Sequence, residues 1–242
     1  MGQGIDVAVS TVILALLPTG GEPGDGPGDE PGSGPGGPRL HLPLVRRTRE
    51  PHRDCWALPG GWVRPEESLA DAGRRTLAET TGLRPSYLEQ LYTFGRPDRS
   101  PTGRVVSVVY TALVRSREAA AAQEGENVRW SVADDATGLA FDHDEVVRYA
   151  LWRLRTKIEY GSIARHFIGE RFSLSQLREV HESVLQRRLD PANFRRAVEA
   201  SGTVEPTDER LTGGRHRPPR LYRAVPAPHG AAPPWEGAGP PA

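Results

Sequence analysis

The first 140 residues show the apolar spacing of a strand-rich domain. Residues 5–17 are rich in Val, Ile and Leu, which is typical of a buried strand. Residues 39–46 alternate apolar and polar side chains around three leucines, and this period of two predicts a second strand. Three further segments have strand character: residues 87–94, 104–114 and 127–132.

One helix and one low-complexity insertion interrupt these strands. Residues 67–81 have helical spacing of their apolar positions, and Gly82 follows as a stop signal. Residues 18–38 are rich in Gly and Pro, so we expect a disordered insertion that enlarges the loop of a hairpin. Strands mixed with one or two helices predict an α+β domain over residues 1–142, built as an α/β/α sandwich with a mixed sheet.

The periodicity becomes helical after about residue 143. A long helix is predicted over residues 144–160, and shorter helices at 162–168, 173–185 and 190–202. The third helix opens with a capping-box pattern, Ser173 with Gln176, and the fourth opens with Asp190 followed by Pro191. A basic loop at 212–220 and a strand-like end at 221–225 follow. This layout predicts a winged helix-turn-helix domain over residues 143–225, with a disordered tail at 226–242.

The two predicted domains also differ in charge. The formal net charge is zero, but residues 148–225 hold 16 basic and 9 acidic side chains. Such a surplus favours an anionic partner such as nucleic acid, and a solvated basic surface is the alternative.

Cysteine, histidine and hydropathy set further limits. A single cysteine, Cys55, excludes an intramolecular disulfide and a cysteine-rich metal site. His143, His166 and His181 lack metal-ligand spacing, so we expect structural roles for them. We see no signal peptide and no apolar stretch long enough to span a bilayer, so we expect a cytoplasmic protein without membrane contacts.

Residues 60–83 carry a recognisable motif, GGWVRPEESLADAGRRTLAETTGL. It resembles the Nudix box, whose helix presents carboxylates to divalent metal bound to a diphosphate. The matching positions are Gly61, Glu67, Arg75, Leu77, Glu79, Gly82 and Leu83. Two positions depart from the pattern, because Thr76 and Thr80 stand where the family has glutamate. The resemblance implies a Nudix fold for the first domain, with a degenerate metal site.

The two departures change the expected chemistry. Thr76, Glu79 and Thr80 share one helix face, and Mg²⁺ prefers carboxylate oxygens, substrate phosphates and water. Because threonine hydroxyls are neutral, Glu79 remains as a weak metal ligand and we expect no catalytic residues. A hydrolase that recruits Glu124 or Glu126 as metal ligands is the alternative.

A cavity of this kind can still hold a ligand. Guanidinium groups suit bidentate contacts to a diphosphate such as that of ADP-ribose. The candidate ligand-binding residues are Arg46, Gly60, Gly61, Arg64, Glu79, Arg99 and Arg104. The family likeness implies that Glu67 and Arg75 form a structural pair. Trp56 could stack on a base, with a core position as the alternative. No cofactor is required in this interpretation, and Mg²⁺ would bind weakly.

The second domain has a resemblance of its own. Residues 155–160, 172–185 and 188–196 resemble the C-terminal domain of the Nudix-related transcriptional regulators of NAD metabolism, the NrtR family. Asn193, Arg195 and Arg196 lie in the first turns of the candidate recognition helix, where side chains reach base edges in the major groove. Phosphate or minor-groove contacts are expected from Arg187, Arg188, Arg215, Arg217 and Arg220. Leu177, Val180, Phe194 and Val198 are expected in the core.

The two resemblances together imply a homodimeric repressor of NAD-metabolism genes. Its partners would be a double-stranded DNA operator and an effector such as ADP-ribose or NAD. Ligand would change the placement of the two winged helices through the helix that starts near His143. One rival is a Mg²⁺-dependent Nudix hydrolase of nucleoside diphosphate derivatives such as ADP-ribose. Another is a winged helix used for protein contacts.

Overall fold

The structure is a computed structural model. It describes residues 4–18, 37–85, 87–122, 125–158, 162–210 and 218–225. Several predictions therefore lie outside the described residues: most of the insertion at 18–38, the tail at 226–242, and the side chains of Glu124, Arg215 and Arg217.

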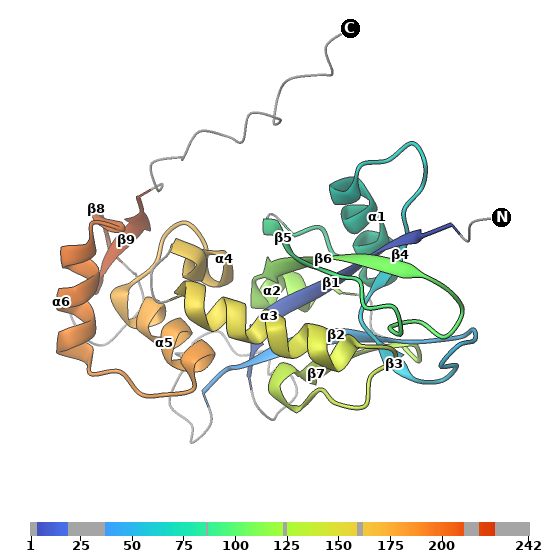
Figure 1. Ribbon diagram of the computed structural model, residues 1–242. Helices are drawn as coiled ribbons and strands as arrows, with labels where there is room; N and C mark the ends of the chain where they lie inside the picture. Colours follow the sequence, from blue (N-terminus) through green and yellow to red (C-terminus); the bar gives the residue numbers. More distant parts are fainter. Residues whose placement is uncertain are drawn as a thin grey trace, which may run out of the picture.

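Among the described residues, seven strands form one mixed sheet (Figure 1). They are β1 (Asp6–Leu17), β2 (Arg39–Arg46), β3 (Trp56–Ala57), β4 (Gly60–Trp62), β5 (Tyr87–Phe94), β6 (Val105–Val114) and β7 (Val128–Val132). The sheet runs β3-β2-β1-β6-β5, with β4 paired to β1 and β7 paired to β2. β1 is parallel to β6 and antiparallel to β2, where Leu17 lies opposite Arg39. The predicted hairpin of the first two strands is therefore confirmed.

Helices cover both faces of this sheet. Val12, Leu14 and Leu16 of β1 belong to the apolar cluster of α3 (His143–Ile158). Ile13 and Ala15 belong instead to the cluster that includes α1 (Leu69–Thr81) and α2 (Ser116–Ala119). Because successive side chains of a strand point to opposite faces, the continuous apolar run of β1 is buried on both sides. This arrangement confirms the α/β/α sandwich.

The helix of the Nudix-like motif begins two residues later than its apolar spacing predicts. The Ser68 side chain caps the helix by accepting a hydrogen bond from the Asp71 N–H, and Gly82 ends it with φ of 72°. Glu67 lies before the cap and forms an ion pair instead of a helical turn. The sequence pattern missed β3 and β4, because two or three residues are too few to show a period.

The C-terminal domain has the predicted helices and the predicted strand at its end. It contains the turn η2 (Ser162–Ala164), α4 (Arg165–Ile168), α5 (Leu174–Leu185), α6 (Pro191–Ser201), β8 (Val204–Arg210) and β9 (Arg220–Ala224). Ser173 and Gln176 form the predicted capping box, and Asp190 caps α6 with Pro191 in its first turn. A further backbone bridge joins Phe172 to Tyr222 of β9. The sequence pattern missed β8, in which Pro206 and three acidic residues hide the strand character.

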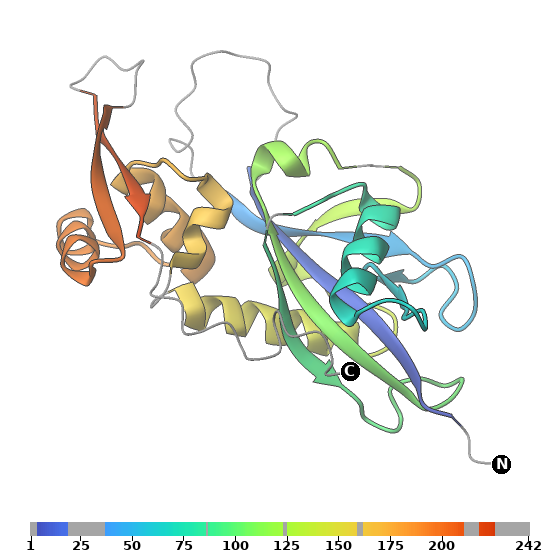
Figure 2. The same cartoon turned by 90° about the horizontal axis from the view of Figure 1, so that it is seen from above.

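The long helix α3 contributes to the cores of both domains. Its buried residues Val147, Leu151 and Leu154 share one apolar cluster with Phe172 and Val184 of the winged helix. Figure 2 shows the winged-helix elements beyond one end of the sheet, with α3 running towards them. The domain boundary at 142/143 stays a prediction, since α3 packs against both sides.

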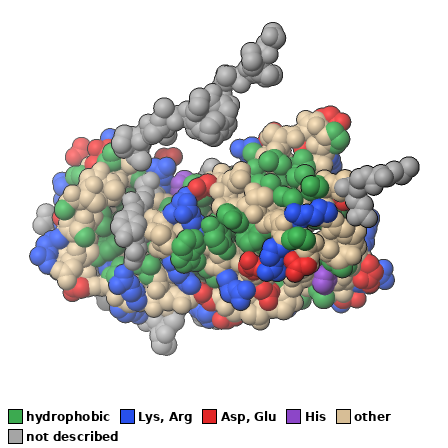
Figure 3. Space-filling view, viewed as in Figure 1, with side chains coloured by type: hydrophobic (Ala, Val, Ile, Leu, Met, Phe, Trp, Pro, Cys, Tyr) green, Lys and Arg blue, Asp and Glu red, His purple; other side chains and the backbone are tan. Residues whose placement is uncertain are grey.

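An aromatic surface lies where α3 meets β5. The ring centroids of Tyr92 and Tyr149 lie 5.2 Å apart, and those of Tyr149 and Trp152 lie 5.4 Å apart. Tyr92 and Trp152 are each 54% exposed. Figure 3 shows hydrophobic side chains gathered on this face, with charged side chains around them. Within the described ranges, no helix is long and apolar enough to cross a membrane.

Candidate nucleotide pocket and DNA interface

The Nudix-like loop is fixed to its helix by one ion pair. Arg75 binds both carboxylate oxygens of Glu67, with Nε–Oε2 at 2.8 Å, and Arg75 Nη2 also donates to the Trp62 carbonyl at 3.0 Å. The Arg64 N–H donates to the same carboxylate at 2.8 Å. These hydrogen bonds, with Arg75 foremost, lower the pKa of Glu67 to about 2. The geometry agrees with the structural role that the family likeness implies.

The helix face that would hold metal in an active Nudix enzyme does not fit a divalent ion. The buried Thr76 hydroxyl donates to the Ala72 carbonyl at 2.9 Å, and the Thr80 hydroxyl donates to the Thr76 carbonyl. The Glu79 carboxylate faces two guanidinium groups, Arg64 at 3.7 Å and Arg75 at 3.2 Å. No group of three or more His, Cys, Asp or Glu side chains in the described part of the chain could hold a metal.

A cavity of about 620 Å³ lies beside this face. Five of the seven predicted ligand-binding residues line it: Arg46, Gly60, Gly61, Glu79 and Arg99. The two glycines fit closely, because a Cβ on Gly60 would lie 2.4 Å from the Val9 carbonyl oxygen. The bare backbone therefore forms part of the cavity wall.

Two predicted residues lie outside this lining. Arg64 is 61% exposed at its side chain and pairs with Glu79. Arg104 donates to the carbonyls of Gly95 and Arg96, at 2.7 and 3.1 Å, and so holds the loop before β6. Trp56 is half-buried, with the Arg129 guanidinium 4.1 Å above its ring.

Sequence reasoning missed a basic loop on the cavity. Arg47 and Arg49 line it together with Phe141. Arg47 Nε donates to the Pro51 carbonyl at 2.8 Å, and its guanidinium lies 4.6 Å from the centre of the Phe141 ring. The run RRTR at residues 46–49, which begins with the last residue of β2, was the available signal, since three arginines at a strand end suit a phosphate-bearing ligand.

The cavity wall is joined directly to the start of α3. Arg99 holds Asp142 through two hydrogen bonds of 2.9 and 2.8 Å, and both side chains are 6% exposed. His143 accepts a hydrogen bond from the Leu58 N–H at Nδ1, at 3.0 Å. Burial lowers the pKa of His143 to about 4, so this imidazole is neutral near pH 7. Arg99, Leu58 and His143 all line the cavity.

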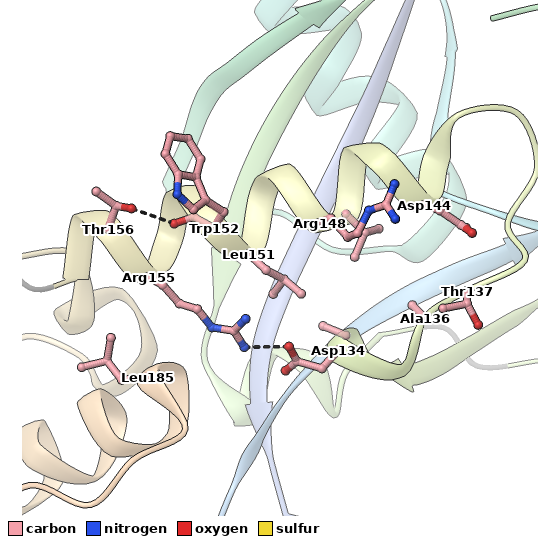
Figure 4. Close-up of a pocket in the computed structure, with 12 residues that line it drawn as sticks. Asp134, Ala136, Thr137, Asp144, Arg148, Leu151, Trp152, Arg155, Thr156 and Leu185 are labelled. Atoms are coloured by element: carbon pink, nitrogen blue, oxygen red, sulfur yellow. Dashed lines mark hydrogen bonds and ion pairs between the residues drawn. The ribbon is translucent and has the colours of Figure 1, made fainter.

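The other half of α3 is joined to the winged helix. Arg155 donates from Nε to the Val184 carbonyl at 2.9 Å and from Nη2 to Asp134 at 2.7 Å (Figure 4). Gln186, at the end of α5, donates to the same Asp134 carboxylate. Because α6 follows α5 after a short turn, α3 connects the cavity wall to the base of the candidate recognition helix.

The candidate DNA-reading helix α6 projects from the body of the molecule. None of its residues is fully buried, and Phe194 and Val198 are only half-buried, in contrast to Leu177 and Val180 of α5. Figure 1 shows α6 at the edge of the molecule, beside the β8–β9 hairpin. Such a position leaves its polar face open to a partner.

Polar contacts order the arginines of α6. Arg195 Nε donates to Glu199 at 3.0 Å, and the Tyr222 hydroxyl of β9 donates to the same oxygen at 3.0 Å. Arg196 Nη2 donates to the Asn193 side chain. Of the predicted phosphate-binding residues, Arg188 is 86% exposed at its side chain and Arg220 is exposed on β9.

The two halves of the chain match two family models. Residues 36–150 match the NUDIX domain, and residues 164–224 match the NrtR DNA-binding winged helix domain. Fold and site therefore define a Nudix domain joined to a winged-helix DNA-binding domain.

Individual relatives narrow this class. The chain is 34% identical over 190 residues, 76% of each protein, to the "ADPR responsive transcriptional repressor NtrR" of Acinetobacter baylyi. It superimposes on the crystal structure of Shewanella oneidensis NrtR complexed with a 27mer DNA with a TM-score of 0.71 and 31% identity, over 91% of this chain and 94% of that one. An "ADP-ribose pyrophosphatase" of Methanocaldococcus jannaschii is 33% identical over 111 residues, 46% of this chain and 66% of its own. The chain belongs to the NrtR family.

Proposed function

We propose that this protein is a DNA-binding transcriptional repressor whose Nudix domain senses ADP-ribose or a related nucleotide. One observation carries the proposal: α3 is built into both candidate sites. Asp142, directly before the helix, and His143, its first residue, hold the cavity wall through Arg99 and Leu58. Arg155 holds the end of α5. A ligand in the cavity therefore acts on the same helix that supports the DNA-reading elements. The repressor and the DNA complex among the relatives support this assignment.

The cavity is suited to binding a diphosphate without cleaving it. Arg46, Arg47 and Arg49 supply positive charge, whereas the metal-facing helix side offers two hydroxyls bonded to backbone and one neutralised carboxylate. Without a held cation, neither the attacking water nor the phosphate is activated. Binding in this account needs no divalent ion.

Calorimetric titration of ADP-ribose in EDTA and in MgCl₂ tests this point. We expect the same affinity in both buffers and no AMP in the Mg²⁺ sample. The double variant Thr76→Glu/Thr80→Glu is the matched comparison, because it restores two carboxylates to the metal-facing side; its affinity or AMP production should become Mg²⁺-dependent. AMP released steadily by the unmodified protein would instead support the hydrolase that the pyrophosphatase likeness suggests.

The DNA partner is proposed to be a double-stranded operator near NAD-metabolism genes, bound by a homodimer in the cytoplasm. Winged-helix regulators commonly read two half-sites, which a two-fold dimer matches. Fluorescence anisotropy on duplex DNA from the intergenic region beside the protein's own gene tests this, with a salt series and a scrambled competitor. Equal affinity for scrambled DNA would reject the operator.

A further inference from the structure

A second basic cavity lies at the junction of the two domains. It has a volume of about 450 Å³ and is lined by Arg115, Arg165, His166, Gly169, Glu170, Arg171, Arg223 and Ala224. Arg115 directly follows β6 of the Nudix domain, whereas the other residues come from α4, the turn after it, and β9. α4 packs against β6, so this cavity spans the domain boundary. None of its residues belongs to the nucleotide pocket or to α6.

In the described part of the chain, one of its arginines has no carboxylate partner and a second has only a long ion pair. Arg165 has none within 4.0 Å, and its Nε lies 3.5 Å from His166 Nε2. For Arg115 the carboxylate of Glu118 lies at 4.0 Å, and the Arg115 side chain is only 28% exposed. By contrast, Arg171 and Arg223 are paired with acidic residues of β8. Partly desolvated guanidinium groups without a close counter-charge favour an anion between them.

His166 lies in a partly buried, positively charged environment. Burial lowers the pKa of His166 to about 4, and Arg165 and Arg115 add to this effect. The imidazole is therefore neutral near pH 7 and can donate one N–H. Its ring packs against Tyr87 with a centroid distance of 4.4 Å, which fixes its position beside the two guanidinium groups.

The turn after α4 lies beside the Arg115 side chain. Gly169 has φ of 106°, a conformation that residues with side chains rarely adopt. A Cβ at this position would lie in ordinary van der Waals contact with Arg115 Cζ, at 3.4 Å, so the Gly169 backbone lies beside the guanidinium group. Arg115 of the Nudix domain is thereby held in a cavity formed mainly by the winged helix.

We infer that this cavity is an anion site that binds a phosphate group between Arg115 and Arg165, with the His166 N–H as a further donor. Guanidinium forks match phosphate oxygens in bidentate geometry. Because the two arginines belong to different domains, the bound phosphate stabilises one relative placement of the domains. The phosphate comes either from a small molecule or from a DNA backbone. The site is independent of the ligand proposed for the Nudix cavity.

Calorimetric titration of the full chain with inorganic phosphate and with pyrophosphate, at fixed ionic strength, tests the site. We expect saturable binding that Arg115→Gln and Arg165→Gln each weaken about tenfold or more, the loss typical of a charge-assisted contact. Arg117→Gln is the matched control, because Arg117 is exposed, lies two residues from Arg115 and does not line the cavity. If Arg165→Gln fails to fold, Arg165→Lys keeps the charge but removes the fork, and it should also weaken binding.

A second measurement, the salt dependence of DNA binding, distinguishes a small-molecule phosphate from a DNA phosphate. If the site takes a DNA phosphate, free phosphate shows no saturable binding, and Arg165→Gln lowers the salt dependence of DNA binding by about one phosphate contact. Either result supports the site. Equal phosphate binding and equal salt dependence in Arg115→Gln, Arg165→Gln and Arg117→Gln would overturn it, whether or not the protein proves to be a nucleotide-sensing repressor.

Discussion

Among single side chains, Arg195 is the residue of α6 best placed to read a base. Its Nε is held by Glu199, which leaves both terminal nitrogens for a bidentate contact to guanine. Arg196 instead uses one terminal nitrogen on Asn193. Buried Tyr222 holds Glu199 from β9 and so acts as a positioning residue.

This network predicts different losses for different variants. Arg195→Lys should lower the ratio of specific to non-specific DNA affinity. The expected change in the corresponding free-energy difference is about 1–3 kcal/mol, the range for one bidentate base contact. Tyr222→Phe keeps the packed ring and should reduce the same ratio by less. Arg188→Gln, which removes an exposed charge, should weaken operator and scrambled DNA alike. Anisotropy with both duplexes measures the ratio, and an unchanged ratio in Arg195→Lys contradicts the assignment.

His143 predicts a dependence of stability on pH. Its folded-state pKa is about 4, below the unfolded value of about 6.5. Between these values the unfolded chain binds a proton that the folded chain excludes, so stability falls as pH falls from about 6.5 to about 4. The loss from this group amounts to about 3 kcal/mol, at about 1.4 kcal/mol per pKa unit.

Urea unfolding at pH 7.5 and at pH 4.5 measures this loss. His143→Asn is the control, because an asparagine can still accept the Leu58 N–H but does not titrate. The unmodified protein should lose more stability on acidification than the variant. Equal losses in the two proteins mean that His143 is not the group responsible.

The sequence identified candidate site residues by their chemical type. Whether each side chain can bind a ligand depends on its partners in the folded structure. Arg99 was predicted as a ligand-binding residue and does line the cavity, but its guanidinium is committed to Asp142, 43 positions away. No local sequence pattern predicts the Arg99–Asp142 ion pair. Phe141, which lies under Arg47, was missed because its position depends on a backbone turn with φ of 58°.

At the scale of elements, capping residues and apolar periodicity were sufficient to predict the helices from the sequence. Ser173 with Gln176, and Asp190 with Pro191, begin α5 and α6 as predicted, because capping depends on neighbouring residues. β4 and β8 could not be found in this way. Their pairing partners, β1 and β9, lie elsewhere in the chain and supply the hydrogen bonds that short or polar segments lack.

The element that most needs testing is α3. Arg155→Gln should leave the affinities for ADP-ribose alone and for DNA alone within about threefold, but it should reduce the effect of either ligand on the other, because it removes contacts to Val184 and Asp134. Arg148→Gln is the control, since Arg148 is an exposed arginine of the same helix (Figure 4). Full coupling in Arg155→Gln would show that α3 acts through other contacts.

At the scale of the whole molecule, two domains share one apolar cluster across α3. The sequence predicts the boundary at residues 142 and 143 and a coupling helix that starts near His143, but no sequence pattern shows that the two domains share an apolar cluster. Because packed cores resist continuous deformation, a shift of α3 would alter the packing of both domains.

The most direct test of nucleotide sensing is reciprocal binding. The affinity for ADP-ribose is measured by calorimetry on the free protein and on the protein saturated with operator DNA, and the affinity for DNA is measured with and without ADP-ribose. Linkage requires both ratios to be the same, and allosteric couplings commonly lie between about 5-fold and 150-fold. We expect two equal ratios in that range. An ADP-ribose affinity that DNA leaves unchanged would contradict the account.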